Sequence, residues 1–129
     1  MQILQPPTWA RPKGYSNGIV ATGKLIFVAG QVGWDENQKF QSDHFIDQAK
    51  QALLNTVAVL KEAGAGPEHI VRMTWFITDK PTYVRTQKQL GEIYRTIMGE
   101  HYPAMSMVVV AALIEDRAKV EIEATAVVP

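Results

Sequence analysis

Tyr102-Pro103-Ala104-Met105-Ser106 leads into one apolar segment, and Val120-Glu121-Ile122-Glu123-Ala124 lies in the next. Because proline ends a helix, Pro103 predicts the start of a strand, which runs over residues 106–112 and is apolar on both faces. We expect this strand to be covered on both sides. Residues 119–128 alternate strictly and predict a second strand, on which Glu121 and Glu123 share one face.

Upstream of this pair, the two-residue period predicts further strands. Residues 15–20 and 24–29 flank Ala21-Thr22-Gly23, and the glycine suits a tight turn, so we expect an opening β-hairpin. Residues 70–78 alternate between a wholly apolar face and a mixed face, which predicts a third strand of the sheet.

A helical period appears twice. From Phe45 to Leu60, apolar residues recur every three or four positions and predict an amphipathic helix, which Ser42 or Asp43 is expected to cap and Gly64 to end. Residues 84–97 predict a second helix, which begins after the cap Asp79-Lys80-Pro81 and stops at Gly99.

These elements predict the α+β class, with a β-β-α-β-α-β-β order and a mixed sheet. Two helices cover only one face of such a sheet. The other face carries Met, Val and Phe side chains that a monomer would expose, so we expect a second copy of the chain to cover it.

Composition limits the possible functions. A chain of 129 residues is about one domain, here residues 1–129. Its 13 basic and 13 acidic residues give no net charge, which argues against nucleic acid as a partner. Absence of cysteine excludes disulfides and thiolate chemistry and suits the cytoplasm. No signal peptide is expected at the N-terminus, and no apolar stretch approaches the ~20 residues of a membrane span.

Few residue patterns predict catalysis by themselves. Glu121 and Glu123 lie roughly 7 Å apart on one strand face. They either sit on a solvated face or orient a water and exchange protons. The three histidines are scattered and no phosphate loop or dinucleotide fingerprint occurs, so we expect neither a metal nor a cofactor. Aromatic residues that either line a pocket or pack in the core are Trp34, Trp75, Tyr83, Tyr94 and Tyr102.

Six short segments, which follow one another along nearly the whole chain, match the pattern of a known family. They are Gly14-Tyr15-Ser16-Asn17-Gly18, Val28-Ala29-Gly30-Gln31, residues 48–60, Ile70-Val71-Arg72-Met73-Thr74, Tyr102-Pro103-Ala104 and Val120-Glu121-Ile122-Glu123-Ala124. Together they resemble the RidA/YjgF family of small trimeric proteins, some of which hydrolyse reactive enamines and imines.

The resemblance implies a chorismate-mutase-like fold, a homotrimer whose sheets form a central barrel, and a small-molecule cleft at each subunit boundary. In deaminating members of the family, a glutamate on the last strand and a tyrosine from the first complete that cleft, where water attacks the C=N carbon. These catalytic roles fall on Glu121 and Tyr15. The resemblance implies that the ligand is contacted by Ala29, Gly30, Gln31, Gly91, Tyr102, Met105 and Ser106.

The chain departs from that family at Met105, where deaminating members carry an arginine that grips a substrate carboxylate. A two-pronged guanidinium–carboxylate contact contributes about 1.5–3 kcal/mol, so its loss weakens binding of a small imino acid by ~10- to 100-fold. A thioether cannot replace it. Arg11, Lys13 and Arg72 are candidate replacement anchors.

Three functions are compatible with this resemblance and with the departure at Met105. The first is a deaminase that needs no metal and acts on a reactive enamine or imine other than a simple α-imino acid. The second is a non-catalytic trimer that binds a small hydrophobic metabolite or a protein partner, because Met105, Ala29 and Gly91 remove polar groups from the cleft. Endoribonuclease activity, which some members of the family have, is the least favoured for a chain without net charge.

Overall fold

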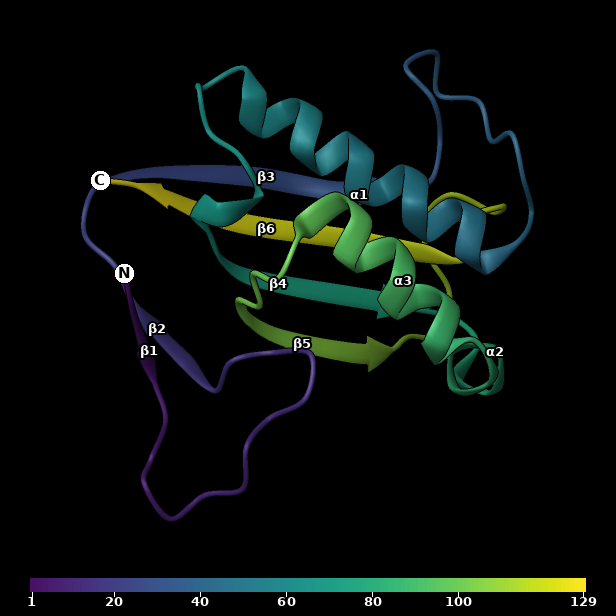
Figure 1. Ribbon diagram of the computed structural model, residues 1–129. Helices are drawn as coiled ribbons and strands as arrows, with labels where there is room; N and C mark the ends of the chain where they lie inside the picture. The colour runs from purple at the N-terminus through teal and green to yellow at the C-terminus, as the bar shows by residue number, and fades with distance from the viewer.

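Figure 1 shows one four-stranded sheet with two long helices across one of its faces. The computed structural model describes all 129 residues. Its elements are β1 (Gln2–Leu4), β2 (Gly18–Val20), β3 (Lys24–Val32), α1 (Phe45–Lys61), η1 (Pro67–His69), β4 (Ile70–Ile77), α2 (Lys80–Arg85), α3 (Gln87–Met98), β5 (Ala104–Val109) and β6 (Val120–Val128). None of the helices combines the length and apolar character that a membrane span requires.

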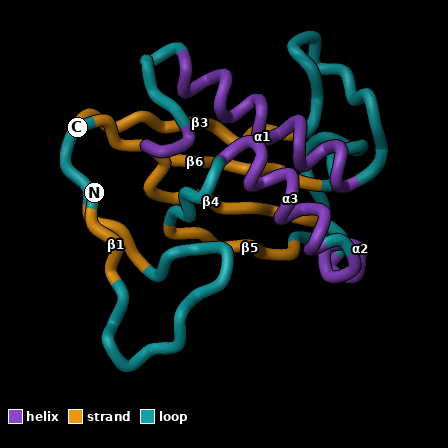
Figure 2. The backbone as a smooth tube through the Cα atoms, viewed as in Figure 1, coloured by secondary structure: helices purple, strands orange, loops and turns teal.

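The sheet is mixed and places the C-terminal strand in its interior. The strand order is β3-β6-β4-β5; β6 runs antiparallel to both of its neighbours, and β4 and β5 run parallel. A parallel pair needs a crossover connection, which α2 and α3 supply. Helices α1 and α3 both lie on the same face of the sheet (Figure 2), which confirms the expected α+β class.

Alternation on the two central strands separates a buried face from an open one. Alternate residues of β4 and β6 are fully or almost fully buried beneath the helices: Met73, Trp75, Ile77, Val120, Ile122, Ala124 and Ala126. The intervening residues, including Arg72, Thr74, Glu121 and Glu123, project from the opposite face. The period of two read from the sequence therefore corresponds to the two faces of this sheet.

A buried glutamine fixes α1 against the chain that enters β6. The Gln48 amide is almost completely buried; its Nε2 donates to the carbonyls of Ser42 and Arg117, both at 3.0 Å. The backbone N–H of Lys119 donates to Gln48 Oε1 at 2.7 Å. A side chain at Gly33 would collide with the Gln48 backbone, so the end of β3 packs directly on the helix.

The open face of the sheet is uncovered in a single chain. Phe27 is 74% exposed there, and Leu25 and Val108 are also exposed. A monomeric protein rarely leaves several large apolar side chains together in water. The structure thus contains the unpaired apolar face that the sequence predicts.

The predicted opening hairpin is wrong. Strand β2 pairs with β1, with Ile19 opposite Ile3, while β3 pairs with β6 over nearly its whole length. Gly23 adopts a φ of +149°, and a Cβ there would run into the carbonyl group of Val128. Glycine is required at this position because the chain enters β3 against the end of β6.

The predicted helix boundaries are mostly correct. Asp79 caps α2 by accepting a hydrogen bond from the Thr82 N–H at 3.2 Å, and Gly64 and Gly99 have positive φ values just beyond α1 and α3. The predicted second helix is divided into α2 and α3 at Thr86. Neither Ser42 nor Asp43 caps α1. Its N-cap is His44, which makes no side-chain cap.

Within one chain, the strand after Pro103 is not covered on both sides, so its expected full coverage stays a prediction about the assembly. Strand β5 ends at Val109, lies at the edge of the sheet and pairs only with β4 apart from one bridge between Ala104 and Ser16. Val108 and Val109 are exposed. The outer side of this edge strand is therefore available for contact with another copy.

Replacing Gly23 by alanine should destabilise the fold by about 3 kcal/mol, because strain at positive φ adds to the collision with Val128. Gly64→Ala is the matched control: its φ is +70°, but a Cβ there meets no atom, so a loss of about 1 kcal/mol is expected. Urea unfolding of both variants measures the difference. Equal losses would contradict the packing of β3 against β6.

Candidate functional site

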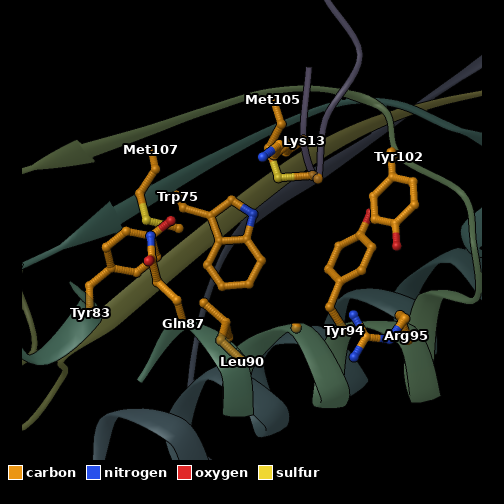
Figure 3. Close-up of a pocket in the computed structure, with 12 residues that line it drawn as sticks. Lys13, Trp75, Tyr83, Gln87, Leu90, Tyr94, Arg95, Tyr102, Met105 and Met107 are labelled. Carbon is orange, nitrogen blue, oxygen red and sulfur yellow. The ribbon is translucent and has the colours of Figure 1, made fainter. Parts of the chain in front are cut away.

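A cavity of about 280 Å³ lies between the helices and the β5 edge of the sheet. Figure 3 shows its residues: Trp75 and Met107 form its floor, and Leu90 and Tyr94 face them from α3. Lys13 and Met105 also line the cavity, and Figure 3 draws both above the Trp75 ring. The cavity is thus assembled from α3, two strands and the N-terminal segment.

Strand register explains why Met105 reaches this cavity. In the parallel pair, Met105 is opposite Met73 and Met107 is opposite Trp75. Since Met73 and Trp75 face the helices, both partners on β5 face them too. Ser106, opposite Thr74, projects from the open face instead.

Trp75 carries the one buried side-chain nitrogen or oxygen without a hydrogen-bond partner. The residue is 1% exposed, and its indole Nε1 has no acceptor in the structure. Buried polar groups in native proteins nearly always have a partner, so an orphaned N–H calls for a specific explanation. Here the orphaned group belongs to a cavity wall.

Two stacked tyrosines and the N-terminal segment close one side of the cavity. The rings of Tyr94 and Tyr102 lie 5.4 Å apart at 10°, and the Tyr94 hydroxyl donates to the His101 carbonyl at 2.7 Å. Burial, with a smaller contribution from Tyr102, raises the pKa of the Tyr94 hydroxyl above its usual range. The Ser16 N–H donates to the Pro103 carbonyl at 3.0 Å, which places Lys13 and Gly14 at the cavity wall.

The charged groups of the cavity wall are cationic. Lys13 and Arg95 line it, and no aspartate, glutamate or histidine does. Neither cation forms an ion pair in the structure. The Arg95 guanidinium lies over Gly91, where a Cβ would be 3.3 Å from its Nη1. The wall therefore offers hydrogen-bond donors and positive charge to a ligand.

Glu121 lies on the opposite face of the sheet from this cavity. Its carboxylate is half-buried over Gly30, where any side chain would collide with Oε2. Nearby, Ala29, Thr74 and Glu123 line a second hollow of about 390 Å³ on the open face. A single chain thus does not bring Glu121 and Met105 into one site.

The residues expected at the cleft consequently fall into separate groups. Met105, Gly91 and Tyr102 line the cavity beneath α3. On the open side lie Ala29, Gly30, Ser106 and Glu121; Gln31 donates from Nε2 to the Ala29 carbonyl at 3.1 Å. Tyr15 is 41% exposed and follows Gly14 at the cavity wall without lining the cavity itself.

The structure distinguishes the candidate cations and adds residues that the sequence interpretation missed. Lys13 lines the cavity, Arg72 lines the hollow on the open face, and Arg11 lines neither. Gln87 and Arg95 were missed, although with Gly91 they recur every four residues and so share one face of α3. No three histidine, aspartate or glutamate side chains are grouped as metal ligands.

Comparisons with known proteins find similarity to one family over most of the chain. The model of the family described as endoribonuclease L-PSP matches residues 8–128. A RutC family protein of Synechocystis is 34% identical over 100% of this chain and 98% of its own length. A human 2-iminobutanoate/2-iminopropanoate deaminase is 31% identical over 88% of this chain and 79% of its own. The crystal structure of the Rid-family protein YyfB from Yersinia pestis superposes with a TM-score of 0.86 and 29% identity, covering 98% of both chains.

Tyr94→Phe should reduce the loss of stability at high pH. Above pH 10 the unfolded chain releases the tyrosine proton while the folded protein retains it, so the free energy of unfolding falls with pH, by up to about 1.4 kcal/mol per unit. At pH 8 the variant should be about 1 kcal/mol less stable, because the bond to His101 is lost. Urea unfolding from pH 8 to 11.5 should show this gap narrowing.

Tyr83→Phe serves as the control, because Tyr83 lines the same cavity but its hydroxyl makes no hydrogen bond in the structure. A gap between wild type and Tyr94→Phe that stays constant with pH would contradict the buried position of the Tyr94 hydroxyl.

Proposed function

This chain belongs to the endoribonuclease L-PSP family, which includes the RidA/YjgF proteins, and on that premise we propose that it is a deaminase of reactive imines or enamines. The observation that carries the proposal is its similarity, over most of its length, to a human deaminase of small imino acids. The proposed reaction uses water and side chains of this chain, with no metal ion or organic cofactor.

In the proposed reaction, the water oxygen bonds to the C=N carbon as the π electrons move to nitrogen, and Glu121 accepts one proton from that water and passes it to the nitrogen, which gives a carbinolamine. Glu121 then transfers the hydroxyl proton of the carbinolamine to the amino nitrogen, the C–N bond breaks, and ammonia leaves as the carbonyl forms. Tyr15 would hydrogen-bond the substrate. The half-buried position of Glu121 over Gly30 supports this role, because it holds the carboxylate in a defined place.

The proposed site is shared between copies of the chain. Met105 and Glu121 project from opposite faces of one sheet, so a cleft that contains both needs Glu121 from one copy and the cavity of another. The exposed face around Phe27 is suited to such packing. We propose a homotrimer with one cleft at each subunit boundary.

One observation favours a second function. The cavity wall contains no carboxylate and no imidazole, and Met105, Met107 and Leu90 make much of it apolar. Without Glu121 from a neighbouring copy, such a cavity binds a ligand and has no base to activate water. A non-catalytic binder of a small apolar metabolite is therefore the alternative.

Glu121→Gln should lower the rate of ammonia release at least ~100-fold, because the amide cannot accept the proton of the attacking water. A panel of imines, generated in place from amino acids by an amino-acid oxidase, supplies the substrates. Glu123→Gln is the matched control, since Glu123 lies two residues away on the same face and is more exposed. It should retain most of the wild-type rate.

The same assay tests Met105. Wild type should release ammonia from 2-iminopropanoate slowly, and Met105→Arg should raise kcat/KM for it by ~10-fold or more, because the guanidinium adds a charge-assisted carboxylate contact. If Glu121→Gln retains the wild-type rate on every imine, Glu121 is not the base. If no imine is turned over at all, the binder is favoured.

Phe27→Lys should dissociate the assembly. Wild type is expected to scatter light as three copies of a 14.4 kDa chain, and the variant as a smaller species, because a lysine on the apolar face opposes its burial. Leu54→Lys, an exposed position on α1, is the control and should leave the mass unchanged. A monomeric wild type would contradict the shared cleft.

A further inference from the structure

The indole N–H of Trp75 is a buried hydrogen-bond donor that has no acceptor in the structure. The residue is 1% exposed, and its Nε1 has no hydrogen-bond partner in the structure. Leaving such a group unpaired in the interior is unfavourable, and a bound ligand that brings an acceptor removes the penalty. Because Trp75 is one of the residues that line the cavity, a ligand bound there is the natural partner.

The indole nitrogen is on the side of the Trp75 ring toward Met105 and Lys13. Figure 3 draws it on that side, while the carbon edge of the ring faces Leu90. A neutral N–H donor and an ammonium group therefore both belong to the part of the cavity wall that includes Met105.

The chemistry of the wall selects an anion with an apolar body. Lys13 and Arg95 are free of ion pairs and no acidic side chain lines the cavity, so negative charge is favoured there. Met105, Met107 and Leu90 offer only apolar contact, and methionine adapts its shape to a ligand. About 280 Å³ suits a small molecule, near the lower end of the roughly 300–1,000 Å³ of ligand pockets.

We infer that Trp75 Nε1–H and Lys13 together hold the carboxylate of a ligand whose remainder is a branched or aromatic apolar group packed on Met105, Met107 and Leu90. This inference rests on the proposed function and specifies its substrate class: 2-imino acids with bulky apolar side chains, and the 2-oxo acids formed from them. The carboxylate anchor is thereby moved from β5 to β4 and the N-terminal segment.

Binding of an unreactive 2-oxo acid tests the anchor separately from catalysis. The chain has three tryptophans, so a ¹H–¹⁵N spectrum contains three indole N–H signals, and Trp75→Phe identifies the one from Trp75. Titration with 4-methyl-2-oxopentanoate should move that signal downfield, as expected for an N–H that gains a charged acceptor. The methyl ester, which lacks the charge, should bind about 10-fold more weakly or worse.

Two substitutions complete the test. Trp75→Phe keeps an aromatic ring but removes the donor, and Lys13→Gln removes the charge; each should weaken the Kd of 4-methyl-2-oxopentanoate about 10-fold. Lys88→Gln is the control for Lys13, because Lys88 is on α3 but does not line the cavity. Its Kd should match that of wild type. If Trp75→Phe does not fold, Trp9→Phe and Trp34→Phe identify the Trp75 signal by elimination, and the wild-type titration with acid and ester still tests the anchor.

The outcomes separate this inference from the proposed function. A Trp75 signal that does not move at saturation, or an ester that binds as tightly as the acid, overturns the anchor even when imines are hydrolysed. A shifted Trp75 signal together with no ammonia release from any imine supports the anchor and overturns the deaminase.

Discussion

Side-chain alternation on β4 and β6 is the constraint on which the rest of the structure depends. Because these two strands occupy the interior of the sheet, each residue on them must face either the helices or the open side. Trp75 goes to one side, and Glu121 and Glu123 go to the other. The edge strand β5 pairs in register with β4, and Met105 is opposite Met73, so the Met105 side chain faces the helices as the Met73 side chain does. The separation of cavity and carboxylate is thus a property of the register.

That separation divides the chemical properties between the two faces. The helix side provides a cavity with donors, two cations and apolar surface, and the open side provides carboxylates, Arg72 and an apolar face. The cavity and the proposed base, Glu121, therefore lie on opposite sides of the sheet. A site that contains both the cavity and Glu121 therefore requires sheets from different copies of the chain.

Features that depend on local sequence were predicted well, and those that depend on distant contacts were not. The helix of residues 45–60, the strand of residues 70–78 and the caps at Asp79, Gly64 and Gly99 follow from periodicity and backbone preference. Gly23 was misinterpreted because its neighbour, Val128, lies at the other end of the chain. The unpaired nitrogen of Trp75 has no sequence signal, since only the folded cavity shows that no acceptor is near. Sequence identified Met105 as a departure and Lys13 as a candidate anchor, but not that both line one cavity.

The short parallel bridge between Ser16 and Ala104 covers one end of the β5 edge. Lys13 and Gly14, just before Ser16, form part of the cavity wall, while Ser106 to Val109 pair with β4 on one side and have no partner strand on the other. An exposed strand edge is a template for pairing with another chain. Detachment of this one segment would therefore widen the cavity and lengthen the free edge in the same event. Both effects would follow from loss of the backbone hydrogen bond between the Ser16 N–H and the Pro103 carbonyl.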